Sequence, residues 1–249
     1  MRATKAIRPV VRRMGLDLTR YPESNPTYRF ARLLQTHRIA TVIDVGANVG
    51  QFASGLREFG FRGEIHSFEP MAAEFAELSR RSANDPRWFV HELGLGDVAG
   101  EATVNVSANS VSSSILPMCE EHLLNAPQSS YTGTETIAVD TLDALLERGV
   151  FDARGRAVLK VDTQGFERQV LAGGAQVCDW VQGIHIEASC VPLYEGQMLL
   201  PEVVAYFERR GMVVEGVELG FTSTDGRMLQ MDLIAFRPEA RLPSARTSP

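Results

Sequence analysis

Two segments in the first third of the chain carry the residue types of a nucleoside-binding site. Residues 41–50 read TVIDVGANVG, so an apolar run contains Asp44 near its end and a glycine turn follows. Residues 64–69 read EIHSFE, a second apolar run that finishes on Glu69. In open parallel sheets, glycines let the backbone approach a ligand, and an acid at the tip of the second strand accepts the ribose hydroxyls. These segments predict binding of an adenosine-like molecule.

The spacing within the turn separates two classes of nucleoside. A dinucleotide site has the pattern G-x-G-x-x-G, because a pyrophosphate must sit against the backbone at a helix N-terminus. Here the pattern is Asp44-x-Gly46-x-Asn48-x-Gly50, with one glycine at the tight turn and an acid ahead of it. The acid repels a pyrophosphate but suits the cationic amino acid end of S-adenosylmethionine. We therefore expect the methyl donor here; the alternative is a tight turn with a solvated Glu69.

Further candidate residues follow from the rule that ligands lie beyond the carboxyl ends of parallel strands. Acids end four of the five predicted parallel strands, and the residues expected at this edge are Asp44, Glu69, Gly94, Asp162 and Glu187. Lys160 and His185 each precede one of these acids by two positions, so each pair shares one side of its strand. Methyl transfer to an alcohol needs positioning and a base for the hydroxyl proton. Asp162, Glu187, His185 and Lys160 are the candidate catalytic residues.

Each of these catalytic candidates has a plainer interpretation. Lys160 and Asp162 form a structural ion pair in one alternative, and His185 is a hydrogen-bonded core residue in another. Asp162, Glu187 and His185 also offer donors for Mg²⁺ or Ca²⁺. No ligand spacing as distinctive as His-Glu-x-x-His occurs, so a divalent metal is not predicted.

The elements that must position these residues alternate between short β-rich runs and helical patterns, which indicates an α/β fold. Strands are expected over 41–45, 64–68, 88–95, 157–161, 183–186, 212–219 and 229–236. Helices are expected over 28–39, 49–59, 71–82, 141–147, 166–172 and 201–210. The last two strands are close in sequence and therefore antiparallel. We expect a Rossmann-like, seven-stranded, mostly parallel sheet with a C-terminal antiparallel hairpin and helices on both faces, as in class I methyltransferases.

Two loops are candidates for shaping the acceptor pocket. Residues 107–133 are rich in Ser, Asn, Gly and Pro, and a loop this long is usually a lid or binding loop, or is disordered. The strand patterns at 101–106 and 134–139 on either side of it suggest a hairpin extension. The second loop, 190–201, follows the fifth parallel strand and contains Tyr194.

Charge is distributed unevenly between the N-terminal segment and the rest of the chain. Residues 1–40 hold nine Lys or Arg against two acids, although the whole chain has a net charge of −6. Basic and apolar residues interleave over 2–16, which predicts an amphipathic helix. Such a helix either lies on an anionic membrane or, more commonly, packs on its own domain with a solvated basic face. The acidic remainder argues against a nucleic acid partner.

Length and composition indicate one enzyme domain. A chain of 249 residues with 44% hydrophobic residues can bury a full core. We divide it into a basic N-terminal helical extension (1–39), a catalytic domain (40–237) and a disordered tail (238–249) with three prolines. The three cysteines lack metal-site spacing, which suits a reduced, cytoplasmic protein, with the inner membrane face as a second location. The sequence does not distinguish a monomer from a homodimer.

Several of these motifs together resemble the FkbM family of S-adenosylmethionine-dependent methyltransferases. The resemblance covers about residues 40–236 and rests on the segments DVGANVG (44–50), FEP (68–70), the 94–100 turn, TLD (141–143) and LKVDTQGFE (159–167). It implies O-methylation of a hydroxyl on a polyketide or other secondary metabolite, or on a sugar of a glycolipid or glycan. The basic leader resembles that of actinobacterial members, for which a cell-envelope glycolipid is the expected acceptor.

The resemblance also implies roles for individual residues. Asp44, Gly46, Asn48 and Gly50 would hold the methionine moiety, and Glu69 the ribose. Lys160, Asp162 and Glu167 fall on the family's Lys-x-Asp-x-Glu-Gly-x-Glu stretch, in which this chain has Gln164 in place of an acid. A role of that acid as base or metal ligand would pass to Glu187 here. A nicotinamide-dependent oxidoreductase and a non-catalytic nucleoside-binding module are the other functions compatible with the sequence.

Overall fold

The computed structural model describes residues 11–14, 21–152 and 155–238. The helix expected over 2–16 and the tail from 239 onward therefore lie outside the described residues, apart from residues 11–14. In the described part of the chain, no helix is long and apolar enough to span a membrane.

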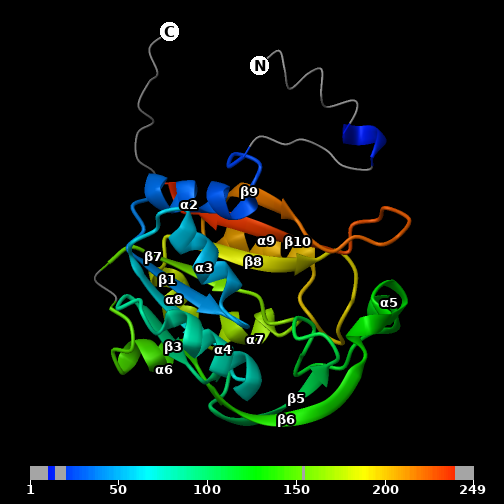
Figure 1. Cartoon of the computed structure of the whole chain (residues 1–249). Coiled ribbons are helices and arrows are strands. Elements are labelled where there is room, and N and C mark those ends of the chain that lie inside the picture. Colours follow the sequence, from blue (N-terminus) through cyan, green and yellow to red (C-terminus); the bar gives the residue numbers. More distant parts are fainter. Residues whose placement is uncertain (1–10, 15–20, 153–154, 239–249) are drawn as a thin grey trace.

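Seven strands form the main sheet (Figure 1). From one edge to the other they are β3 (Trp88–His91), β2 (Glu64–Phe68), β1 (Thr41–Val45), β7 (Ala157–Val161), β8 (Gly183–Ser189), β10 (Gln230–Phe236) and β9 (Val213–Leu219). The first five are parallel to one another, whereas β10 runs antiparallel between β8 and β9. The expected parallel sheet with a C-terminal antiparallel hairpin is confirmed.

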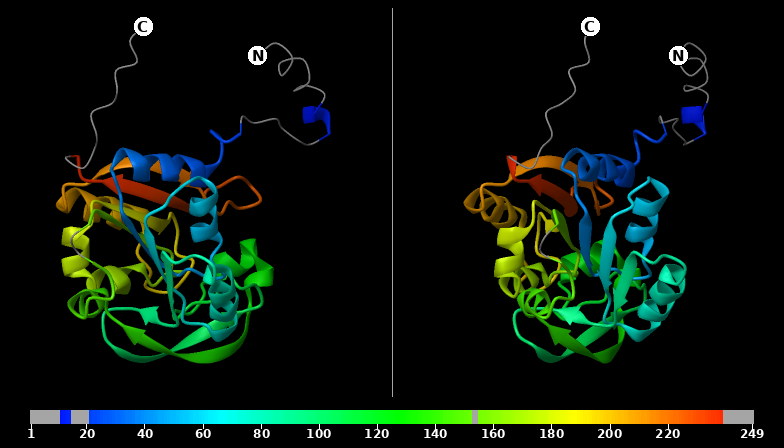
Figure 2. Two further views of the ribbon diagram at one scale, coloured as in Figure 1. Left: turned by 60° about the vertical axis from the view of Figure 1, so that its left-hand side comes forward. Right: turned by 90° about the vertical axis from the view of Figure 1, so that its left-hand side faces the viewer.

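Helices cover both faces of this sheet, as the two views in Figure 2 show. One face packs against α2 (Pro26–Thr36), α3 (Gln51–Glu58) and α4 (Ala72–Ser82). The other packs against α6 (Leu142–Glu147), α7 (Glu167–Ala172), α8 (Ala175–Trp180) and α9 (Leu200–Arg209). Burial on both faces explains why β1 and β7 are apolar with few interruptions and are buried at every position.

A second, three-stranded sheet lies across the carboxyl ends of the parallel strands (Figure 1). It consists of β4 (Gly94–Leu95), β6 (Tyr131–Asp140) and β5 (Gly100–Ser107), in that order. The strand expected over 88–95 is therefore wrong in its second half. The pairing of β3 with β2 in the main sheet ends at His91. Gly94 pairs with Val139 of β6 in the small sheet instead.

The other differences from the expected elements are local. The 107–133 loop contains α5 (Glu120–Asn125) and a short 3₁₀ helix (Pro127–Ser129), both too short to give a periodic signal. Helix α8 was not expected, since it is six residues long and directly follows two glycines. Strand β8 continues to Ser189 because β10 pairs with it along its whole length.

Candidate functional site

A cavity of about 430 Å³ opens where the parallel strands end against the small sheet. That volume falls within the range of roughly 300–1,000 Å³ typical of small-molecule sites. Its walls come from the glycine turn after β1, the end of β2, the small sheet, the 107–133 loop, the segment after β7, and β8 with β10. Of the predicted site residues, the cavity wall includes Gly46, Asn48, Glu69, Gly94, Asp162 and Glu187.

The glycine turn is shaped by close approach to the neighbouring strand. Gly46 has φ +75°, and a Cβ there would lie 1.8 Å from the carbonyl oxygen of Asp162. Asn48 also has positive φ, and its side-chain oxygen accepts a hydrogen bond from the Val49 N–H. Its amide nitrogen donates to the Ser110 carbonyl at 2.7 Å. The turn is thereby connected to the 107–133 loop on the far side of the cavity.

Glu69 lies at the tip of β2 with its carboxylate fixed by the backbone. The side chain accepts hydrogen bonds from the N–H groups of Asn48 (2.8 Å) and Met71 (3.0 Å). The residue is only 6% exposed, and burial raises the pKa of its carboxyl to about 7 against the opposing effect of these two donors. A carboxylate held in this way at the cavity wall is placed to accept hydrogen bonds from the hydroxyl groups of a ligand.

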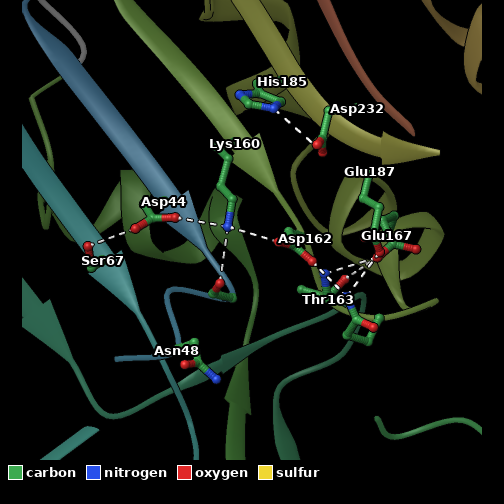
Figure 3. A network of polar contacts seen from close by, with 12 residues as sticks. Asp44, Asn48, Ser67, Lys160, Asp162, Thr163, Glu167, His185, Glu187 and Asp232 are labelled. Atoms are coloured by element: carbon green, nitrogen blue, oxygen red, sulfur yellow. Dashed lines mark hydrogen bonds and ion pairs between the residues drawn. The ribbon is translucent and has the colours of Figure 1, made fainter. Parts of the chain in front are cut away.

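Asp44 and Lys160 form a buried ion pair behind the turn (Figure 3). The Lys160 ammonium lies 3.2 Å from Asp44 and 3.4 Å from Asp162, and it donates to the Gly46 carbonyl at 3.1 Å. Burial lowers the pKa of Lys160, but the charges of Asp44 and Asp162 outweigh that effect and raise it above its ordinary value. Ser67 donates to the other oxygen of Asp44.

Neither member of this pair lines the cavity, which differs from the expected direct roles of Asp44 in ligand contact and Lys160 in catalysis. Both residues lie within strands, and their side chains point to the sheet face that α3 covers. Gly50 is also absent from the cavity wall. Gly50 is the N-cap residue of α3 and has positive φ. A Cβ at this position would lie 2.8 Å from Leu78. These three residues support the turn from behind.

The part of the cavity at the ends of β7 and β8 holds two carboxylates joined by an amide. The Gln164 amide nitrogen donates to Asp162 (2.9 Å) and to Glu187 (3.0 Å), and its oxygen accepts from the Tyr194 hydroxyl (2.9 Å). Gln230 donates to the same oxygen of Glu187 at 2.9 Å. Burial and the nearby carboxylates of Asp162 and Glu167 raise the pKa of Glu187 well above its ordinary value.

His185 does not join this group, so its expected role as a base is not supported by its position. Its ring packs edge-on against Phe30 (4.8 Å between ring centroids) and Phe52 (5.7 Å), on the α2 and α3 face. The carboxylates of Asp162 and Glu187 lie at the cavity instead. The alternative metal site composed of Asp162, Glu187 and His185 is therefore not assembled.

Several side chains of the cavity wall were not expected from the sequence. His122 of α5 is 3% exposed, lines the cavity and has no partner for its Nδ1; burial lowers its pKa. Phe221 and Gln230 also line the cavity. They come from loops and hairpins distant in sequence, where no local pattern signals a site. Tyr194, expected either to face the acceptor or to lie in a plain surface loop, is fully buried, and its hydroxyl donates to Gln164.

The strand order, the glycine turn and the acid at the tip of β2 together define the class I S-adenosylmethionine-dependent methyltransferase fold. The family model for the methyltransferase FkbM domain matches residues 44–214. The chain therefore belongs to the FkbM methyltransferase family. None of the curated proteins matches it.

Solved structures that share this fold are distant in sequence. A magnesium protoporphyrin IX methyltransferase from Synechocystis, with bound S-adenosylmethionine, is 10% identical and has a TM-score of 0.48, covering 94% of this chain and 95% of that one. A putative O-methyltransferase from Klebsiella pneumoniae is 10% identical with a TM-score of 0.45, covering 94% and 89%. A putative methyltransferase from Thermobifida fusca is 14% identical with a TM-score of 0.46, covering 85% and 78%.

Proposed function

We propose that this FkbM methyltransferase transfers a methyl group to a hydroxyl on a sugar of a glycolipid or glycan. The observation that carries the proposal is one cavity with two chemically different ends. Glu69, Gly46 and Asn48 line one end, and the bridged carboxylates Asp162 and Glu187 line the other. The first end suits a nucleoside, and the second suits a hydroxyl that must lose a proton.

The residues of the first end fit S-adenosylmethionine. Glu69 would accept the ribose hydroxyls, and Gly46 and Asn48 would present the backbone to the methionine moiety. Asp44, paired with Lys160, would support the turn from behind. When bound, the cofactor supplies a methyl group on a cationic sulfur. As that methyl group passes to the acceptor oxygen, a protein group would have to take the hydroxyl proton.

The acceptor end offers that proton acceptor and several positioning groups. Asp162 or Glu187 would take the proton, held in place by the amide groups of Gln164 and Gln230. Phe221 adds an aromatic side chain to the same wall. Amides and carboxylates beside an aromatic ring suit a sugar, which presents several hydroxyls around an apolar ring face. The basic N-terminal segment would bring the protein to an anionic membrane that carries a glycolipid.

Calorimetric titration with S-adenosylhomocysteine tests the cofactor assignment. We expect one site per chain, with affinity strongly reduced by Glu69→Ala and unchanged by Glu64→Ala, which removes an exposed carboxylate at the other end of β2. Absence of binding at millimolar ligand would refute the proposal. Incubation with radiolabelled methyl donor and a glycolipid extract then tests the acceptor, since a binding module without catalysis leaves no labelled product.

A further inference from the structure

Three metal-binding side chains meet on the sheet face opposite α9, outside the methyltransferase cavity. His185 of β8, Asp232 of β10 and Glu218 of β9 each offer one ligand atom, and these atoms all lie within 4.8 Å of one another. The strand register brings them together, because Asp232 pairs with Glu218 across the C-terminal hairpin and β10 pairs with β8. Figure 3 shows the His185 ring directed at Asp232.

The hydrogen-bonding capacity of this cluster is unmet. His185 is 5% exposed and its Nδ1 has no partner. Its Nε2 lies 3.6 Å from the Asp232 carboxylate, beyond the length of a normal hydrogen bond. One carboxylate oxygen of Glu218 is also buried without a partner. Buried polar groups in native proteins are nearly all paired, so the unpartnered Glu218 oxygen and the long His185–Asp232 separation indicate a partner that lies between them.

No side chain of the described part of the chain supplies that partner. The nearest lysine on the sheet, Lys160, forms its ion pairs with Asp44 and Asp162. The charge of Arg29 of α2 acts on Glu218 from a distance, but Arg29 forms no ion pair with it among the described contacts. Two carboxylates and an imidazole therefore face one another without a protein cation between them.

We propose that His185, Glu218 and Asp232 bind a divalent transition-metal cation, with Zn²⁺ as the ion the donor set favours. Zinc binds imidazole nitrogen and carboxylate oxygen at about 2.0–2.2 Å, which separates the donors of a tetrahedral site by about 3.3 Å. The 3.6 Å between His185 and Asp232 is close to that separation. Calcium and magnesium prefer sites with oxygen donors alone.

The position of the cluster defines what the cation does. It joins β8, β10 and the edge strand β9, so its effect is to stabilise the C-terminal hairpin. The Asp232 side chain is 32% exposed, which leaves room for entry and for a water ligand. None of the three residues lines the cavity, so this inference does not depend on the proposed function.

Titration of the tag-free, metal-stripped full chain with ZnCl₂ tests the proposal. We expect one Zn²⁺ per chain, a higher Tm with zinc, and weak or absent binding of MgCl₂. Asp232→Asn and Glu218→Gln should each weaken zinc binding at least about tenfold. Asp225→Asn, in the turn of the same hairpin and outside the cluster, should bind zinc as the wild type does.

Circular dichroism and titration with S-adenosylhomocysteine serve as checks that each variant is folded. The proposal is overturned if the wild type binds no zinc at micromolar concentration, or if both cluster variants bind it as tightly as the control. Cobalt substitution gives an independent readout, because tetrahedral Co²⁺ absorbs in the visible range and the two cluster variants should lose that absorption.

Discussion

At the scale of single residues, Glu69 makes the cofactor site sensitive to pH. Burial raises the pKa of its carboxyl from 4.5 to about 7, so the group is largely protonated at pH 6 and ionised at pH 8. In the role proposed for Glu69, the ionised form accepts hydrogen bonds from both ribose hydroxyls. We expect the affinity for S-adenosylhomocysteine to rise about tenfold from pH 6 to pH 8.

Calorimetry at pH 6, 7 and 8 measures this dependence, and Glu69→Gln should flatten it. The raised pKa has the opposite effect on the free protein. Its stabilising contribution is fully present below pH 4.5 and is lost as the pH rises through about 7, because the folded state disfavours the ionised carboxylate. An affinity that falls with rising pH would contradict the assigned role of Glu69.

Substitution of Gly46 and of Gly60 by alanine distinguishes backbone strain from overpacking as the cost of an added methyl group. Both have positive φ, but a Cβ at Gly46 would lie 1.8 Å from the Asp162 carbonyl oxygen, whereas nothing lies within 4 Å at Gly60. We expect Gly60→Ala to cost about 1 kcal/mol through backbone strain, and Gly46→Ala about 3 kcal/mol because overpacking is added. Urea unfolding of both variants measures the difference; equal losses would show that the close approach is unimportant.

At the scale of elements, position along a strand decides which acids reach the cavity. Asp44, Lys160 and His185 lie inside strands and point to a face covered by helices, whereas Glu69 and Asp162 follow the last residue of their strands. Glu187 reaches the cavity because β8 extends beyond its pairing with β7, which ends at Ile186. Counting acids near strand ends therefore identified the right edge but not the right orientation.

Burial of the parallel strands on both faces explains how much of the fold could be predicted. The bounds of β1, β2 and β7 match those expected from sequence, since continuous apolar runs ending at polar turns mark strands buried on both faces. The small sheet could not be predicted as a separate unit, because the departure at Gly94 depends on pairing with β6, distant in sequence. His122 and Gln230 were missed for the same reason: tertiary contacts alone bring them to the site.

The pairing of β1 with β7 places Lys160 opposite Asp44, and a double-mutant cycle measures that contact. Lys160→Met leaves the fully buried Asp44 without a counter-ion and should cost about 3–5 kcal/mol. Asp44→Asn in the same chain should recover part of that loss, because the stranded charge disappears.

The exposed pair Arg168–Glu202 is the matched control for this cycle. Its nitrogen–oxygen distance is 2.7 Å, but both side chains are nearly half exposed. Arg168→Met should therefore cost less than about 1 kcal/mol. Additive losses in the Asp44 and Lys160 variants would show that the two charges do not interact.

At the scale of the whole molecule, the cavity is closed by segments that are distant in the sequence. The glycine turn and the end of β2 form one side, and the 107–133 loop, connected to the turn through Asn48 and Ser110, forms the other. A ligand in this cavity therefore links elements that otherwise share few contacts. Binding to the native state alone also stabilises it, by about 2.7 kcal/mol at a hundredfold excess over the Kd.

Hydrogen exchange with and without S-adenosylhomocysteine tests this arrangement across the molecule. We expect slower exchange at residues 46–50, 69–72 and 109–115, which line or adjoin the cavity. Helix α9 and strand β9 provide the internal control, because none of their residues reaches the cavity wall. Protection spread equally over α9 and β9 would indicate general stiffening, whereas protection confined to the first three segments would locate the ligand between the glycine turn and the 107–133 loop.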